Sequence, residues 1–242
     1  MQNRGHSKIE AMLKTKFFFL LLIPAIFTFT ETGKAADYPP SARESIEWCD
    51  IWISHANETN LPRVLLIGDS ITRAYYPQVE KRLAGKAYVG RLCSSAFISD
   101  PVLLMQIKMV LSQYKFDVIH INNGMHGWQH SEQEYEEALP EYLKTIREYA
   151  PNAKLIWANT TPLKVSPPSS ENDTIATDKR IDARNAIAAK LMQAQGIPVE
   201  DLNTPMRGHP EYHQDNVHFN GLGITIQSAP IAADIEKLLE QP

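Results

Sequence analysis

The stretch RVLLIGDSITRAYY, residues 63–76, decides the fold of this chain. Its first half, RVLLIG, is a nearly continuous apolar run of the kind found in strands that are buried on both faces. A Gly-Asp-Ser turn follows, and the residues after it adopt the spacing of an amphipathic helix. A buried strand that passes directly into a helix is the start of a βαβ unit, which predicts a parallel sheet.

The same alternation continues along the rest of the chain. Predicted strands cover residues 63–68, 87–91, 117–122, 154–159 and 197–202. Predicted helices cover residues 71–83, 102–114, 131–149, 178–195 and 230–239, with a kink or break at Pro140. Residues 165–177 are polar and contain prolines, which indicates a long loop after the fourth strand. We therefore predict an α/β fold, a three-layer α/β/α sandwich with a parallel sheet of about five strands.

The N-terminal residues have the pattern of a targeting segment. Lys14 and Lys16 precede the apolar run FFFLLLIPAIFTF, residues 17–29, and small residues follow it. This order is typical of a signal peptide, and the run is short for a membrane-spanning helix. We expect residues 1–36 to be a signal peptide and residues 37–242 to form a single domain that is secreted or periplasmic. An uncleaved membrane anchor is the alternative.

Charge and cysteine content narrow the classes of partner and cofactor. The formal net charge is −4, and removal of residues 1–36 would make the chain more acidic, which excludes the basic surface that nucleic-acid binding needs. Cys49 and Cys93 lack the spacing of a metal or redox motif, so we expect two small buried side chains. A disulfide between them is the alternative. His126 and His130 lie four apart in a loop-like stretch, so we predict no metal site and no cofactor.

Three polar residues at opposite ends of the chain suggest nucleophilic catalysis. Ser70 follows the carboxyl end of the first predicted strand, the edge at which open α/β sheets bind ligands. Asp215 and His218 stand three residues apart before a helix, so one turn could aim both side chains in one direction. Asp215 could then hold Nδ1 of His218 while Nε2 takes the hydroxyl proton of Ser70. The competing interpretation is that Asp69 or Ser70 only caps a helix.

These two blocks, GDS at residues 68–70 and DNVH at residues 215–218, resemble those of the SGNH hydrolases, the GDSL-like esterases and lipases. The resemblance extends over residues 63–223. It implies a strand order of 2-1-3-4-5, a Ser-His-Asp triad and an oxyanion hole. One donor of that hole would be the backbone N–H of Ser70.

The second and third of the four blocks of the family pattern are different here. The third block of the family usually has an asparagine amide after the third strand. In DVIHINNGMHGW, residues 117–128, His126 falls where that asparagine is expected. An imidazole N–H can also donate to an oxyanion, although its donation depends on tautomer and pH. Asn122 or Asn123 is the alternative if the register differs by a few residues.

The second block of the family normally supplies a glycine N–H after the second strand. Here the stretch is YVGRLCSSAFISDP, residues 88–101. Ser95 falls at that position when strand ends are matched, and Gly90 is the alternative.

Arg73 and Trp128 are candidate substrate-binding residues, although either could be structural. The whole pattern predicts an exported serine esterase that removes short acyl groups, O-acetyl groups of carbohydrates in particular, through an acyl-enzyme. Its expected partner is a small-molecule or oligosaccharide ester, with no stable membrane insertion after signal cleavage. An acyltransferase with the same triad and a non-catalytic carbohydrate-binding protein are the alternatives.

Overall fold

The computed structural model describes residues 43–168 and 174–241, which belong to the second of two units in the chain, residues 38–242. The predicted signal peptide, residues 1–36, lies outside the described residues. Within the described ranges, no helix combines the length and apolar character needed to cross a membrane.

Six strands form a single sheet in the order β1-β3-β2-β4-β5-β6. They are β1 (Cys49–Ile53), β2 (Arg63–Gly68), β3 (Tyr88–Ser94), β4 (Val118–Ile121), β5 (Lys154–Ala158) and β6 (Val199–Glu200). Strands β2 to β6, which are the five predicted strands, pair in parallel. Counted from β2 as the first, they follow the expected order 2-1-3-4-5. The prediction of an all-parallel sheet is wrong at one edge, because β1 pairs antiparallel with β3. No residue of β1 is fully buried, so the apolar run that marks the other strands is weak there.

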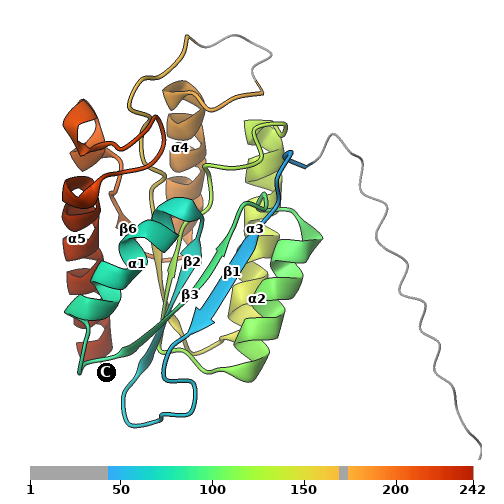
Figure 1. Cartoon of the computed structure of the whole chain (residues 1–242). Helices are drawn as coiled ribbons and strands as arrows, with labels where there is room; N and C mark the ends of the chain where they lie inside the picture. Colours follow the sequence, from blue (N-terminus) through green and yellow to red (C-terminus); the bar gives the residue numbers. More distant parts are fainter. Residues whose placement is uncertain (1–42, 169–173, 242) are drawn as a thin grey trace, which may run out of the picture. The chain divides into compact units, whose positions relative to one another are not determined.

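Helices cover both faces of this sheet (Figure 1). They are α1 (Ser70–Arg82), α2 (Pro101–Gln113), α3 (Glu132–Tyr149), α4 (Asp178–Ala194) and α5 (Gly221–Glu240). Residues of α1 and α5 pack on one face, and residues of α2, α3 and α4 pack on the other. The predicted three-layer α/β/α sandwich is confirmed.

Two features of the helices differ from the predictions, because proline is tolerated at an exposed helix position. Pro140 lies on the exposed side of α3, which continues from Glu132 to Tyr149 without a break. Helix α5 begins at Gly221 rather than at Pro230, because the side chain of Asn220 accepts the N–H groups of Leu222 and Gly223.

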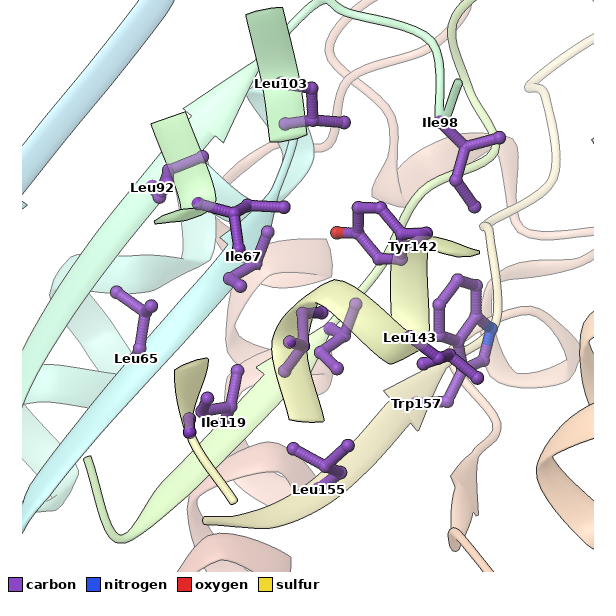
Figure 2. Packing of buried hydrophobic residues seen from close by; sticks show 14 of the residues in the cluster. Leu65, Ile67, Leu92, Ile98, Leu103, Ile119, Tyr142, Leu143, Leu155 and Trp157 are labelled. Carbon is purple, nitrogen blue, oxygen red and sulfur yellow. The ribbon is translucent and has the colours of Figure 1, made fainter. Parts of the chain in front are cut away.

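Strand β2 contributes to both halves of the core and thereby fixes the position of the residues that follow it. Leu65 and Ile67 face the cluster under α2 and α3, where Figure 2 shows them with Tyr142 of α3. Val64 and Leu66 face the cluster under α1 and α5. All four aliphatic side chains are at most 1% exposed. The GDS turn therefore starts from an anchored strand end.

The two cysteines do not form a disulfide. In the register of β1 and β3, Cys49 pairs with Ser94 and Cys93 pairs with Asp50. Because successive residues of a strand point to opposite faces, the two thiols lie on opposite sides of the sheet. Cys93 is buried as expected, and burial raises the pKa of its thiol, whereas Cys49 is exposed and the prediction of burial is wrong there.

We predict that Gly68→Ala lowers the free energy of unfolding by about 1–3 kcal/mol, the usual cost of overpacking. A Cβ atom at this position would lie 2.0 Å from Oγ1 and 2.8 Å from Cβ of Thr72, in the first turn of α1. Urea unfolding measures the change. Gly221→Ala is the control, because a Cβ there meets no atom within 4 Å. Equal stability of the two variants would contradict the prediction.

Candidate active site

Ser70 is the first residue of α1 and is separated from the carboxyl end of β2 only by Asp69. Asp69 is the N-cap, and its Oδ1 accepts the N–H of Ile71 at 2.8 Å. Backbone N–H groups in the first turn have no acceptor within the helix, and the helix dipole favours negative charge there. Since Asp69 provides the cap, the hydroxyl of Ser70 can serve another partner.

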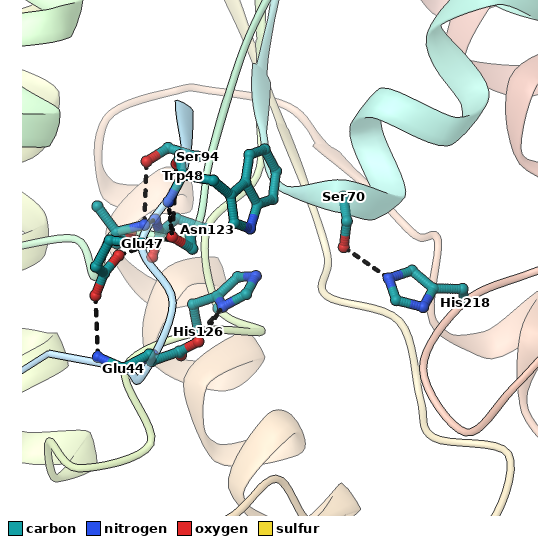
Figure 3. A network of polar contacts seen from close by, with 12 residues as sticks. Glu44, Glu47, Trp48, Ser70, Ser94, Asn123, His126 and His218 are labelled. Atoms are coloured by element: carbon teal, nitrogen blue, oxygen red, sulfur yellow. Dashed lines mark hydrogen bonds and ion pairs between the residues drawn. The ribbon is translucent and has the colours of Figure 1, made fainter. Parts of the chain in front are cut away.

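That partner is His218, which lies 148 residues further along the chain. Oγ of Ser70 is 2.9 Å from Nε2 of His218, and Nδ1 of His218 is 2.8 Å from Oδ2 of Asp215 (Figure 3 shows the first contact). Oδ1 of Asp215 accepts the backbone N–H groups of Val217 and His218 and so closes the turn between them. The structure thus brings together the serine, histidine and aspartate that the sequence pattern singled out.

The charge of Asp215 suits a partner that gains a proton. Burial is the largest single influence on Asp215 and raises its pKa, but the two backbone hydrogen bonds and the nearby His218 together outweigh it and lower the pKa to about 2. The carboxylate is therefore ionised at neutral pH. It favours the His218 tautomer with the proton on Nδ1, which leaves Nε2 as an acceptor for the Ser70 hydroxyl.

A cavity of about 460 Å³ opens beside this trio. Polar residues and apolar residues share its lining: Ser70, His218, His126, Glu44, Ser45, Gln129 and Thr174 on the polar side, and Met125, Trp128, Ile175, Ala176 and Val217 on the apolar side. An acyl ester fits this chemistry, because it needs an apolar surface for the acyl group and polar groups at the reacting carbonyl.

The two ring nitrogens of His126 differ in their hydrogen bonding. Nδ1 lies 3.0 Å from Oε2 and 3.1 Å from Oε1 of Glu44, whereas Nε2 is buried and has no hydrogen-bond partner in the described part of the chain. In Figure 3 the Nε2 edge of the ring points to the side on which Ser70 and His218 lie. Burial lowers the pKa of His126, but Glu44 and the charges of Asp69 and Glu47 outweigh this and raise it above its ordinary value.

Ser95 and Gly90 do not offer the second oxyanion donor that the family pattern implied. The N–H of Ser95 donates to the carbonyl of Trp48 at 3.2 Å, and its hydroxyl donates to Oε2 of Glu47 at 2.7 Å. Gly90 was expected at a strand end, but β3 continues to Ser94 and Gly90 pairs with Leu65 on one side and Ile53 on the other.

The alternative amides to His126 are also engaged. Nδ2 of Asn122 donates to the carbonyl of Ala158 at 2.9 Å and to Oγ1 of Thr160 at 3.2 Å. Nδ2 of Asn123 donates to the carbonyl of Ala96 at 3.3 Å. Among His126, Asn122 and Asn123, His126 is therefore the residue whose side chain lines the cavity and keeps a side-chain nitrogen without a partner in the described part of the chain.

The two candidate substrate-binding residues differ in position. Arg73 places its guanidinium 4.8 Å from the ring centroid of Trp48 and does not line the cavity. Trp128 does line the cavity but is only 8% exposed, with the guanidinium of Arg184 4.1 Å from its ring centroid. Trp128 thus offers the cavity little ring surface for stacking on a sugar.

Arg184 of α4 organises the loop of residues 122–130 after β4, which we call the third-block loop, and sequence reasoning missed this arginine. Its guanidinium is fully buried and donates to four carbonyls, those of Gly124, His126, Gly127 and His130. Burial lowers its pKa to about 10, so it remains charged at neutral pH. A signal was present, because an arginine stands on the apolar side of a helix, three residues after Ile181 and four before Ala188.

Residues 43–48, which we call the 43–48 segment, were also missed. Arg43 approaches Asp100 to 3.7 Å, Glu44 binds His126, and Trp48 and Glu47 bind Ser95. The segment precedes the first predicted strand and has no recognisable motif, so nothing in its residues indicated that it lines the cavity.

Comparison with known proteins gives a family match. Residues 66–225 match the model of the GDSL-like Lipase/Acylhydrolase family, a range that includes Ser70, His126, Asp215 and His218 but not Glu44. No curated protein matches the chain.

Solved structures with the same fold include a GDSL-like lipase from Bacteroides thetaiotaomicron, with 22% identity, a TM-score of 0.59 and coverage of 72% of this chain and 88% of that one. A carbohydrate esterase family 3 protein from Talaromyces cellulolyticus has 17% identity, a TM-score of 0.58 and coverage of 74% and 99%. A carbohydrate acetylesterase from Sinorhizobium meliloti has 13% identity, a TM-score of 0.58 and coverage of 73% and 99%. At these identities the likeness establishes the fold.

Proposed function

The chain belongs to the GDSL-like lipase/acylhydrolase family, and from this premise we propose that it is an exported serine esterase that hydrolyses short-chain acyl esters. One observation carries the proposal. Oγ of Ser70 is within hydrogen-bond distance of Nε2 of His218, and Nδ1 of the same ring is within hydrogen-bond distance of Oδ2 of Asp215. A nucleophile, its base and the group that orients the base stand in the order required for acyl transfer.

In the proposed reaction, His218 accepts the hydroxyl proton of Ser70 as Oγ attacks the ester carbonyl. The tetrahedral oxyanion is stabilised by the backbone N–H of Ser70 and by His126. His218 then protonates the leaving alcohol as its bond to the acyl carbon breaks, which leaves an acyl-enzyme. Water attacks that ester with the same base, the acid is released, and Ser70 recovers its proton.

Acetyl esters of carbohydrates are the substrate class that we favour. Met125, Ile175 and Val217 give the cavity of about 460 Å³ an apolar wall for a short acyl group, beside the polar side chains that share the lining. The acidic composition and the predicted signal peptide favour a substrate outside the cytoplasm. Carbohydrate esterases among the proteins of the same fold support this choice.

We predict that para-nitrophenyl acetate and acetylated oligosaccharides are hydrolysed with higher kcat/KM than long-chain acyl esters, because polar side chains share the lining of the cavity with the few apolar ones. A panel of esters measures this, and a fluorophosphonate probe identifies the nucleophile. The probe is expected to label Ser70 in the wild type and to fail with Ser70→Ala.

Each opposite result corresponds to another function. Preference for long-chain esters would make the protein a lipase, and transfer of the acyl group to a sugar without free acid would make it an acyltransferase. Absence of labelling at Ser70 would leave a carbohydrate-binding protein without turnover.

A further inference from the structure

The contact between Glu44 and His126 gives the cavity a charged pair. The carboxylate of Glu44 accepts a hydrogen bond from Nδ1 of His126 and another, at 3.0 Å, from the backbone N–H of Gly127. The carboxylate itself is held in place, because the 43–48 segment is bound to Ser95 through Glu47 and Trp48. The carboxylate of Glu44 thus contacts the third-block loop, and the segment that carries it is bound to Ser95. Its position relative to that loop is therefore fixed.

The position of Glu44 determines what the other nitrogen of His126 can do. A carboxylate beside Nδ1 requires a proton on Nδ1, so in the neutral ring Nε2 would be a bare acceptor. An acceptor repels an oxyanion. Nε2 becomes a donor only when the ring carries both protons. The buried, unpartnered Nε2 can therefore serve the oxyanion only as part of an imidazolium.

The surroundings of His126 favour that charged ring. The other titratable or charged groups around it come from each element packed against it: Glu44 and Glu47 in the 43–48 segment, Asp69 before α1, Arg184 of α4 and His218 across the cavity. Burial opposes the charge, but the carboxylates outweigh it and raise the pKa of His126. Burial also raises the pKa of Glu44, yet His126, Gly127 and Arg184 outweigh it and lower that pKa.

We propose that Glu44 is a positioning residue that holds His126 as an imidazolium, so that a cationic Nε2–H replaces the neutral amide donor of the family in the oxyanion hole. The inference rests on the proposed function, because it concerns the oxyanion of that same reaction. A charged donor forms a stronger hydrogen bond to an oxyanion than a neutral one. This strength offsets the loss of the second-block donor, whose candidates Ser95 and Gly90 are engaged elsewhere.

The proposal predicts an alkaline limit to activity. His126 donates from Nε2 below its raised pKa and loses that donor as the pH rises through it. Above that limit the rate constant kcat for para-nitrophenyl acetate should fall by roughly 10²-fold, the cost of one oxyanion donor, while KM changes little. A donor that acts only in the transition state affects kcat in this way.

Glu44→Gln tests the role of the charge, because a glutamine can still accept from Nδ1 of His126 and from Gly127. We expect the alkaline limb of kcat to move to lower pH, with the acid limb and the melting temperature retained. Glu134→Gln is the matched control: Glu134 accepts Nδ1 of His130 at 3.2 Å in the same part of the chain, outside the cavity lining, and the substitution should leave the profile unchanged. His126→Asn supplies a neutral donor and should remove the alkaline limb.

The possible results separate this proposal from the proposed function. If Ser70→Ala is inactive and Glu44→Gln keeps the wild-type alkaline limb, the role of Glu44 is refuted while the esterase stands. A uniform loss of activity at all pH values in Glu44→Gln, with a lowered melting temperature, would reduce Glu44 to a structural contact and refute it too. If Ser70→Ala keeps full turnover, the esterase assignment and this role fail together.

Discussion

Replacing Ser70 by alanine is expected to reduce hydrolysis of para-nitrophenyl acetate by roughly 10⁴-fold or more, because the attacking oxygen is removed. The fold should be retained, since the cap of α1 is provided by Asp69 and the side chain of Ser70 is bonded to His218 rather than to the core. Steady-state kinetics measure the loss, and thermal unfolding checks that the variant is folded.

Two further variants make this result specific. Ser112→Ala removes a hydroxyl that donates to the carbonyl of Lys108 at an exposed position of α2, outside the cavity lining, and should leave kcat unchanged. His218→Ala should cost about as much as Ser70→Ala, and the double variant little more, because the two residues act as a unit. Turnover by folded Ser70→Ala at the wild-type rate would refute the nucleophile and with it the esterase mechanism.

Replacing Arg184 by alanine is expected to lower the free energy of unfolding by about 3–5 kcal/mol. The substitution leaves buried carbonyls of the third-block loop without donors and opens a cavity under the ring of Trp128. Because the loop carries His126, kcat should fall as well. Urea unfolding measures the stability, and a folded fraction of the variant can be assayed for activity.

Lys190→Ala on the same helix is the control, because the side chain of Lys190 is 83% exposed. Its free energy of unfolding should stay within about 0.5 kcal/mol of the wild type. Arg184→Lys should fall between the two, since one ammonium group cannot reach all the carbonyls that a guanidinium does. An Arg184→Ala protein as stable as Lys190→Ala would show that the loop is held in another way.

The layered fold was accessible from sequence because its signals are local. Doubly buried strands such as β2 read as apolar runs, and the helices between them have apolar residues at helical spacing. The edge strand β1 was missed for the converse reason, since its side chains are half-buried or exposed. Pro140 does not break α3 as its residue type predicts, because a proline on an exposed helix surface loses a hydrogen bond without disturbing the packing.

The site was accessible only where residue type and short spacing coincide. Asp215 and His218 share one turn, and Ser70 begins a helix at a strand end, so their chemistry could be inferred from short blocks. The donors of the second block could not be assigned, because the engagement of Ser95 depends on the 43–48 segment that crosses it. The contact of Glu44 with His126 is set by tertiary structure alone, across 82 positions of the chain.

The short outer strand β6 has a consequence for the behaviour of the protein in concentrated solution. Unpaired backbone groups at a long, flat sheet margin can recruit a second molecule and start aggregation. Here β1 has five residues and is joined to β3 by the ion pair of Asp50 and Arg91, while β6 has two residues and follows Pro198. The β6 margin thus offers little ladder for edge-to-edge growth, and self-association by strands added beside β6 is disfavoured.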